Sequence, residues 1–385
     1  MINYNHNCLI SVVTAPNRSR YGYIVGSVQN DVPTAQAASY MYSEAGRLLH
    51  SMKMDIVQER IFARGSEKET VLQVRRAALQ KKDETFAHEL FSYIDCTPLF
   101  DTDFAGFILR VAPREKVQTI LHDNKPCGKR WLEDNVQHII LQNINGIEPA
   151  ESSLTRAIQV RNMFYKADSI LRELGGSYRD VVRTWFYLSN ILEWYGTFNA
   201  IRNDVYNEFG LMPSIDNNVL TLPSSTGIGV NNTQKAAGTI DLYAIVGPET
   251  CKPRIMQLNN KGQKNAYEYG AAFSRGTVIR NARSRSMQLS GTAAINHRGL
   301  SLFHDSCKQQ IDFAFQKIRE LLRPLSAGLK DICAATAFLK NRHEISKLKN
   351  YFTSHGLAEL PCVYVAADIC RPELLFELDG ELLFH

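Results

Sequence analysis

The sequence has no long run of apolar residues. A helix needs about 18–20 such residues to cross a bilayer, and no stretch of this chain approaches that length. The first residues, Met1-Ile2-Asn3-Tyr4-Asn5-His6, contain neither the basic segment nor the apolar segment of a secretory signal peptide. These absences predict a cytoplasmic protein that does not work in a membrane.

The eight cysteines form no Cys-x-x-Cys pair, and no cluster of cysteine and histidine has the spacing of zinc ligands. The Gly-x-Gly in residues 223–229 lacks the strand–turn–helix context of a nucleotide-binding loop, so we expect a turn or pocket wall there. No Ser-His-Asp order with a nucleophile elbow is present either. We therefore expect a protein that uses no metal and no cofactor.

Positive charge is in modest excess, with a net charge of +5 spread along the chain. The densest basic run extends from Arg275 to Arg285 and is typical of a solvated face or loop. No stacking aromatic residues and no known nucleic-acid module accompany it, so we expect no nucleic-acid partner. One or two arginines holding a small anionic substrate fit this composition better.

The chain does contain a pattern that occurs three times. In each copy a helix with an apolar stripe is followed by a polar turn, an aspartate and a strand of β-branched and aromatic residues. An apolar residue lies six positions before the aspartate, and an aromatic residue lies seven positions after it. The aspartates are Asp55, Asp180 and Asp331; Leu49, Leu174 and Leu325 precede them, and Phe62, Tyr187 and Phe338 follow.

These repeats predict an α/β (α+β) protein in which each unit lays its helices on one face of a mixed β-sheet. A chain of 385 residues is long enough for two or three such units. Glycine and proline at residues 146–149 and 247–249 suggest where one unit ends and the next begins. We expect units at residues 1–147, 148–250 and 251–385, the first being the most degenerate.

The repeat unit resembles the RidA/YjgF family, also labelled endoribonuclease L-PSP. Residues 170–187 and the strand Leu374-Leu375-Phe376-Glu377-Leu378-Asp379 carry the resemblance. It implies a fold like that of trimeric chorismate mutase, in which three units pack together with active sites between them. Three copies in one chain would form a pseudo-trimer, so the chain would be either a monomer or a homo-oligomer.

A longer resemblance, to the RidA-like enzymes called chorismatases, covers residues 160–385. It implies a cofactor-independent lyase or hydrolase that removes pyruvate from chorismate or a related enol ether. Two places depart from the family patterns: Cys362 stands where RidA deaminases have an arginine, and residues 296–299 lack the expected Gly-His arrangement. The matching blocks, in order, are residues 182–187, 198–202, 223–229, 260–270, 273–275, 290–295 and 370–377.

Removal of pyruvate requires a proton on the methylene carbon of the enol ether, which a carboxylic acid with a raised pKa can supply. Glu377 lies among apolar neighbours that would disfavour its charged form, and the resemblance gives it this acid role. Cys370 stands at the position that separates chorismatase subtypes, and a cysteine there is associated with 3-hydroxybenzoate as the product. The alternatives are a solvent-facing glutamate and a packed cysteine.

Arg275 is the expected clamp for a substrate carboxylate, because a guanidinium fork suits that geometry; a surface ion pair is its alternative. Arg202 is a second candidate. We expect Asp241 to occupy in the middle copy the place of Glu377, and we place the site where the C-terminal copy meets the middle one. The other residues expected in the pocket are Gln263, Tyr267, Tyr269, Gly291 and Thr292, with core packing or a strand bulge as alternatives.

Two other functions fit the same residues. A RidA-like deaminase would release ammonia from an enamine or imine, although Cys362 replaces the arginine expected for that reaction. A non-catalytic protein would bind a small carboxylate and be stabilised by it without turnover.

Overall fold

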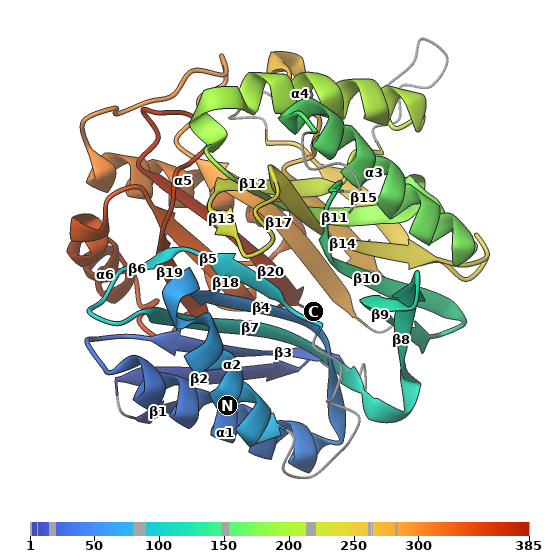
Figure 1. Ribbon diagram of the computed structural model, residues 1–385. Helices are drawn as coiled ribbons and strands as arrows, with labels where there is room; N and C mark the ends of the chain where they lie inside the picture. Colours follow the sequence, from blue (N-terminus) through green and yellow to red (C-terminus); the bar gives the residue numbers. More distant parts are fainter. Residues whose placement is uncertain are drawn as a thin grey trace.

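The computed structural model describes residues 2–5, 7–14, 21–79, 90–147, 154–212, 221–260, 263, 265–281 and 284–384. They form three β-sheets, and the helices lie on the outer faces of these sheets (Figure 1). This is the mixed α and β architecture that the repeats predict.

The first unit comprises residues 2–113. Its strand order is β1-β2-β3-β7-β4-β5, and β13 of the second unit extends the sheet beyond β5. The elements are β1 (Ile2–Asn5), β2 (Cys8–Thr14), β3 (Gly22–Val28), α1 (Thr34–Met52), β4 (Met54–Ala63), α2 (Lys68–Leu79), β5 (Ser92–Asp95), β6 (Thr97–Pro98) and β7 (Phe104–Pro113).

The second unit comprises residues 117–246, and its strand order is β12-β11-β14-β10-β9-β8. The elements are β8 (Val117–His122), β9 (Lys125–Glu133), β10 (Val136–Ile144), α3 (Arg156–Glu173), β11 (Val181–Leu188), α4 (Ile191–Glu208), β12 (Ser224–Gly229), β13 (Asn231–Asn232) and β14 (Gly238–Val246).

The third unit comprises residues 254–384. Its strand order is β15-β16-β17-β20-β18-β19, and β6 of the first unit pairs with β19 at its edge. The elements are β15 (Arg254–Leu258), β16 (Gly276–Arg280), β17 (Arg285–Ala293), α5 (Cys307–Leu322), β18 (Ile332–Leu339), α6 (Ile345–Ser354), β19 (Cys362–Ala366) and β20 (Phe376–Phe384).

All three units repeat one connectivity. The last strand of each unit, which we call the closing strand (β7, β14 or β20), lies between the third and fourth strands of that unit in chain order. It is antiparallel to both. The aromatic residue seven positions after each repeated aspartate pairs with its closing strand at an equivalent position. Phe62 pairs with Gly106, Tyr187 with Thr239, and Phe338 with Glu377. The sequence repeats therefore coincide with structural repeats.

This register corrects the expectation for Asp241. Asp241 pairs with Trp185, and its counterpart on β20 is Asp379, which pairs with Thr336. The position of Glu377 is held in the second unit by Thr239, two residues before Asp241. A shift of two residues keeps side chains on the same face of a strand, so matching by acidic residue type alone misplaced the equivalence.

The strand pairing favours another boundary than the one expected at residue 147. Strands β8, β9 and β10 precede that boundary, yet β10 pairs with β14 of the second sheet. We therefore propose unit boundaries at residues 113–117 and 246–254.

Two of the repeated aspartates, Asp180 and Asp331, end the turn between helix and strand, whereas Asp55 already lies in β4. Asp180 accepts a hydrogen bond from the backbone N–H of Ser177 at 2.9 Å. Asp331 accepts one from the backbone N–H of Gly328 at 2.7 Å. Such a bond satisfies a backbone donor that the turn would otherwise leave unpaired. It therefore fixes the direction in which the following strand begins.

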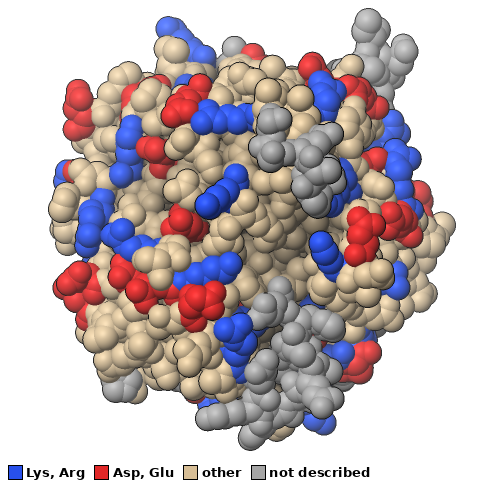
Figure 2. Space-filling model, in the orientation of Figure 1, with Lys and Arg blue, Asp and Glu red and all other residues tan. Residues whose placement is uncertain are grey.

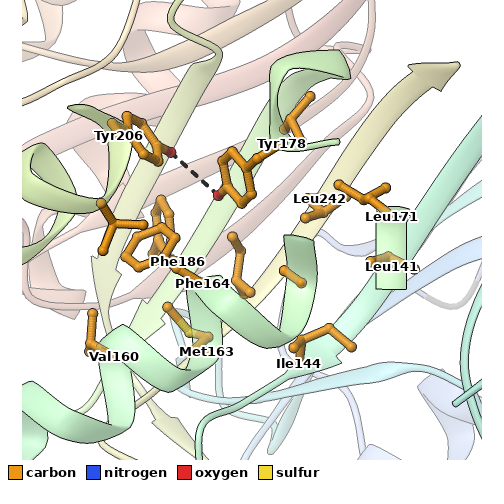
Figure 3. Packing of buried hydrophobic residues seen from close by; sticks show 14 of the residues in the cluster. Leu141, Ile144, Val160, Met163, Phe164, Leu171, Tyr178, Phe186, Tyr206 and Leu242 are labelled. Atoms are coloured by element: carbon orange, nitrogen blue, oxygen red, sulfur yellow. Dashed lines mark hydrogen bonds between the residues drawn. The ribbon is translucent and has the colours of Figure 1, made fainter. Parts of the chain in front are cut away.

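A central hydrophobic cluster lies between the three sheets and contains all three repeated aromatic residues, Phe62, Tyr187 and Phe338. Further clusters fill the space between each sheet and its outer helices. In the second unit, Phe164 of α3 packs beside Tyr178 and Tyr206, whose hydroxyl oxygens are 3.4 Å apart (Figure 3). Fully burying one large apolar side chain contributes about 1.5–3 kcal/mol, so these layers hold the sheets in position.

Basic and acidic side chains are mixed on the face of the molecule shown in Figure 2. None of the helices within the described ranges combines the length and apolar character needed to cross a membrane.

The three units meet at three seams. Strand β13 pairs with β5 between the second and first units, and β6 pairs with β19 between the first and third units. Between the second and third units, β12 lies against β17, and the backbone N–H of Ser225 donates to Ser290 Oγ at 2.8 Å. This last seam contains the candidate site.

Candidate active site

A cavity of about 160 Å³ lies at the seam between the second and third units. An apolar cavity of roughly 150 Å³ accepts benzene, so this cavity is of a size for a ligand with one six-membered ring. The second unit lines it with Tyr195, Asn199, Arg202, Ser225 and Gly227. The third unit lines it with Tyr269, Ala271, Phe273, Arg275, Gly291, Ala293, Ile295, Cys370, Arg371 and Glu377.

Glu377 lies at the start of β20, where its side chain is 5% exposed. Its carboxyl group contacts the backbone of Gly291 on β17, because a Cβ atom on Gly291 would lie 1.9 Å from Glu377 Oε1. Gly291 also stands where the pairing of β17 with β20 shifts register, between Leu289 and Thr292. The bulge and the close approach therefore occur together, and the atom that approaches this glycine is a carboxylate oxygen of the protein itself.

Burial raises the pKa of Glu377 from 4.5 to about 8. The negative charge of Asp379 raises this pKa further, while Arg183 and Arg275 oppose the increase. At neutral pH the carboxyl group therefore keeps its proton. A carboxylic acid in this state can donate a proton to a substrate.

Two arginines from different units line the same cavity. Arg275 and Arg202 are each 2% exposed, and their guanidinium groups lie 5.3 and 5.7 Å from the centroid of the Phe273 ring. Arg275 Nη2 donates to the hydroxyl of Tyr269 at 2.9 Å, and Arg202 Nη2 donates to Asn199 Oδ1 at 2.6 Å. Two buried cations beside a protonated acid favour an anionic ligand.

Cys370 lies on the cavity wall, in the loop before β20. Burial raises the pKa of its thiol to about 12, and the charge of Glu377 adds to that effect against the opposing effect of Arg371. Arg371 Nη1 donates to Gly299 O at 2.8 Å and Ser301 Oγ at 3.2 Å. At neutral pH Cys370 is therefore a neutral thiol, which suits a role in shaping the site or passing a proton.

Three residues expected in the pocket lie beside it instead. Tyr267 packs against the hydrophobic cluster under α3 and α4. Gln263 Nε2 donates to the carbonyl oxygens of Ala293 and Ile295, at 3.3 and 2.9 Å. Thr292 Oγ1 donates to the backbone of its own strand at 3.0 Å. These contacts support the wall that Ala293 and Ile295 form.

Several lining residues were not expected from the sequence. Tyr195 and Asn199 precede Arg202 on α4 by seven and three residues, a spacing that places all three on one helix face. That periodicity could have identified them. Phe273 lies in a loop, where no periodic pattern marks an inward-facing side chain. For residues 223–229 the sequence predicts a turn or pocket wall; Ser224–Gly229 form strand β12, and Ser225 and Gly227 line the cavity.

Cys362, which replaces the deaminase arginine, is fully buried in the hydrophobic cluster between the third sheet and its helices. It does not line the cavity. Among the residues that the structure describes, no group of three or more histidine, cysteine, aspartate or glutamate side chains is placed to hold a metal ion.

No family model matches the sequence. A chorismatase from Streptomyces rapamycinicus is 24% identical over 227 residues, and the alignment spans 53% of this chain and 64% of that protein. A crystal structure of chorismatase at 1.08 Å resolution matches with a TM-score of 0.59 and 19% identity. It covers 76% of this chain and 86% of its own.

A structure of a YjgF-family member from Mycobacterium tuberculosis aligns with 34% of this chain and 100% of its own, at 15% identity and a TM-score of 0.28. The chorismatase structure covers the larger share of this chain, and its TM-score shows a shared fold. The resemblance that the ordered sequence blocks indicated is confirmed: this chain has the chorismatase fold and is similar to a chorismatase in sequence.

Proposed function

We propose that this protein is a chorismatase-like enzyme that removes pyruvate from chorismate or a closely related enol ether. One observation carries the proposal: Glu377 lines a cavity that also holds two buried arginines, and its pKa of about 8 keeps it protonated at neutral pH. Chorismate is a cyclohexadiene with two carboxylates and an acid-sensitive enol ether. It presents negative charge to Arg275 and Arg202 and a basic carbon to Glu377.

In the proposed reaction, Glu377 transfers its proton to the methylene carbon of the enol ether. The C=C bond supplies the electron pair, and the positive charge that forms is shared with the ether oxygen. The carboxylate left on Glu377 lies near this charge and stabilises it. Arg275 and Arg202 hold the substrate carboxylates, so that the methylene carbon stays within reach of the acid.

Pyruvate can then leave by two routes, of which one consumes a water molecule and the other does not. Hydrolysis adds one water to the cationic carbon, and the resulting hemiketal breaks into pyruvate and a dihydroxycyclohexadiene acid. The second route uses no net water and gives pyruvate and 3-hydroxybenzoate, whose atoms together equal those of chorismate. We propose the second route, because Cys370 lies on the cavity wall at the position that the chorismatase resemblance associates with 3-hydroxybenzoate.

The experiment is to mix the purified protein with chorismate and to measure pyruvate with a lactate dehydrogenase assay and aromatic products by chromatography. We expect equal amounts of pyruvate and 3-hydroxybenzoate. Glu377→Gln removes the acid and should lower the rate at least 100-fold, while 3-hydroxybenzoate still raises the melting temperature of this variant.

Other outcomes identify other functions. Absence of pyruvate, or full activity in Glu377→Gln, contradicts the proposal. Ammonia released from freshly generated 2-aminoacrylate would indicate a RidA-like deaminase. Stabilisation by chorismate without turnover would indicate a binding protein.

We further propose that the chain is a monomeric pseudo-trimer that works in the cytoplasm. The strand pairs at two seams, β5 with β13 and β6 with β19, support this arrangement because they join different units within one chain. Sedimentation should give the mass of one chain, 43.5 kDa; a multiple of it would indicate a homo-oligomer. Cell fractionation tests the location.

A further inference from the structure

Three buried polar side chains lie directly behind Glu377, and we call them the support network: Asp379, Arg183 and Thr226. Asp379 follows Glu377 by two residues on β20, so both side chains leave the same face of the strand. Arg183 Nη2 on β11 donates to Asp379 Oδ2 at 2.8 Å, and Thr226 Oγ1 on β12 donates to the same oxygen at 2.8 Å. All three side chains are at least nine-tenths buried.

The Thr226 hydroxyl connects this network to the residue that Glu377 contacts. Besides donating to Asp379, it accepts hydrogen bonds from Arg183 Nη2 at 2.6 Å and from the backbone N–H of Gly291 at 3.1 Å. One donated and two accepted bonds use the full capacity of a hydroxyl group. The network therefore holds Gly291 through its N–H and holds β20 through Asp379. These are the two partners of the contact between Gly291 and Glu377.

The first unit supports this network although it contributes no residue to the cavity. The guanidinium groups of Arg183 and Arg60 lie 4.6 and 4.7 Å from the centroid of the Trp185 ring. Arg60, from β4 of the first unit, also pairs with Glu381 on β20 at 3.0 Å. Trp185 thus joins Arg183 to a charged pair that links the first and third units.

The charge of Asp379 acts on Glu377 from within its own strand. Among the described groups that face Glu377, Asp379 is the anion, and a neighbouring negative charge disfavours ionisation of a carboxylic acid. The other titratable groups near Glu377 are arginines, tyrosines and one cysteine: Arg183 from β11, Arg202 and Tyr195 from α4, Tyr269 and Arg275 from the segment before β16, and Cys370 and Arg371 from the loop before β20.

We propose that Asp379, fixed by Arg183 and Thr226, is a positioning residue that holds the Glu377 carboxyl group against Gly291 and keeps it protonated. The proposal rests on the function proposed for Glu377 as the acid. It gives the buried Arg183–Asp379 pair a role in the reaction in addition to its role in joining the second and third units. It also gives the first unit a place beside the network, since Arg60 of that unit lies at the same Trp185 ring as Arg183 and pairs with Glu381 on β20.

The test is the pH dependence of pyruvate release in Asp379→Asn. Activity that needs protonated Glu377 falls as the pH rises through the pKa of this group. Without the charge of Asp379 that fall should move to lower pH by about one unit. The matched control is Asp241→Asn, because Asp241 is fully buried at the equivalent position of β14, where it accepts hydrogen bonds from Ser92 Oγ and the Asn143 N–H. This control should leave the position of the fall unchanged.

A second measurement does not depend on turnover. The infrared band of the protonated Glu377 carboxyl group, identified by its loss in Glu377→Gln, should disappear at lower pH in Asp379→Asn than in the unmodified protein. An unchanged titration in folded Asp379→Asn overturns the proposal. A shifted titration in a protein that releases no pyruvate supports the positioning role and contradicts only the proposed reaction.

Thr226 provides a second pair of variants if Asp379→Asn does not fold. Thr226→Val removes the hydroxyl that connects Asp379 with Gly291 and should lower the rate at least tenfold, whereas Thr226→Ser keeps the hydroxyl and should restore most of it. Equal rates in both variants would contradict the proposal.

Discussion

The closing strands of the first and third units differ at one equivalent position, where the first has Gly106 and the third has Glu377. In the first unit the glycine lies on the closing strand itself, with φ +140°, and a Cβ atom there would be 2.0 Å from Gly26 O on β3. In the third unit the glycine, Gly291, lies on the neighbouring strand β17, and the closing strand carries the acid. Between the closing strand and its neighbour, the first unit therefore has backbone packed against backbone, whereas the third unit has a carboxyl group.

The second unit gives an intermediate case, because Thr239 occupies this position there. The three units thus share their strand order and register but carry chemically different side chains at this position of the closing strand. A fold supplies positions, and the function depends on the side chains placed at them. The following changes test whether this local difference gives the third unit its proposed role in the reaction.

The largest effect is expected from Gly291→Ala. The new Cβ atom would overlap Glu377 Oε1, at 1.9 Å, so the carboxyl group must move. The rate of pyruvate release should fall at least 100-fold, since small displacements of catalytic groups cost about that much. Gly196→Ala in α4 is the control, because a Cβ atom there meets nothing within 4 Å. A fully active Gly291→Ala protein would show that the close contact between Gly291 and the Glu377 carboxyl group is unimportant for the reaction.

The next effect concerns stability and its pH dependence. The folded pKa of Glu377 is raised from 4.5 to about 8, so the folded protein binds this proton more tightly than the unfolded chain does. Stability is therefore lost as the pH rises from about 4.5 to about 8. Glu377→Gln should remove that loss and stabilise the protein by a few kcal/mol at pH 8.5.

Urea unfolding at pH 5 and pH 8.5 measures this difference. Thr239→Val changes the equivalent position in the second unit, which carries no ionisable group, and should shift stability equally at both pH values. A Glu377→Gln protein with the same gain at pH 5 and pH 8.5 would indicate that Glu377 is ionised in the folded state.

A smaller effect is expected from Arg275→Lys. The lysine lacks the planar fork that binds a carboxylate through two nitrogen atoms, and it loses the bond to the Tyr269 hydroxyl. KM for chorismate should rise about tenfold. Arg110→Lys is the comparison, since Arg110 is a buried arginine on the closing strand of the first unit that contacts the ring of Tyr243 at 4.0 Å, away from this cavity. It should lower stability and leave KM unchanged.

The smallest effect on rate is expected from Cys370→Ala. This neutral thiol lies on the wall of the cavity and is not the proposed proton donor, so total pyruvate release should change only a few fold. The aromatic product should shift from 3-hydroxybenzoate toward the dihydroxycyclohexadiene acid, as measured by chromatography. An unchanged product ratio would remove the proposed role of Cys370.

Much of the fold could be predicted because its signals are local. The helix, turn, aspartate and strand pattern around Asp180 and Asp331 depends on residues within about 25 positions of each other, and the structure repeats it with one register. The burial of Glu377 was also predictable, because its neighbours along β20 are apolar. In both cases the residues that determine the outcome are adjacent in the sequence.

The remaining features depend on distant partners. The expected first unit includes strands β8 to β10, because the pairing of β10 with β14 joins residues about 100 positions apart and no local pattern marks it. Strands β9 and β8 follow β10 into the second sheet. The Asp379 contacts to Arg183 and Thr226 span 196 and 153 positions, and no local pattern indicates them. The equivalence of Asp241 with Asp379, rather than Glu377, is set by strand pairing, which residue type alone does not reveal.

The joining of three like units into one chain has a consequence for how the protein can change. In an assembly of identical chains, each substitution appears at every symmetry-related position, so a change that helps one site alters all of them. In this chain Gly106, Thr239 and Glu377 are separate residues, each encoded once. Each position can therefore mutate independently: substitutions at two of the seams can favour stability while those at the third favour the proposed substrate.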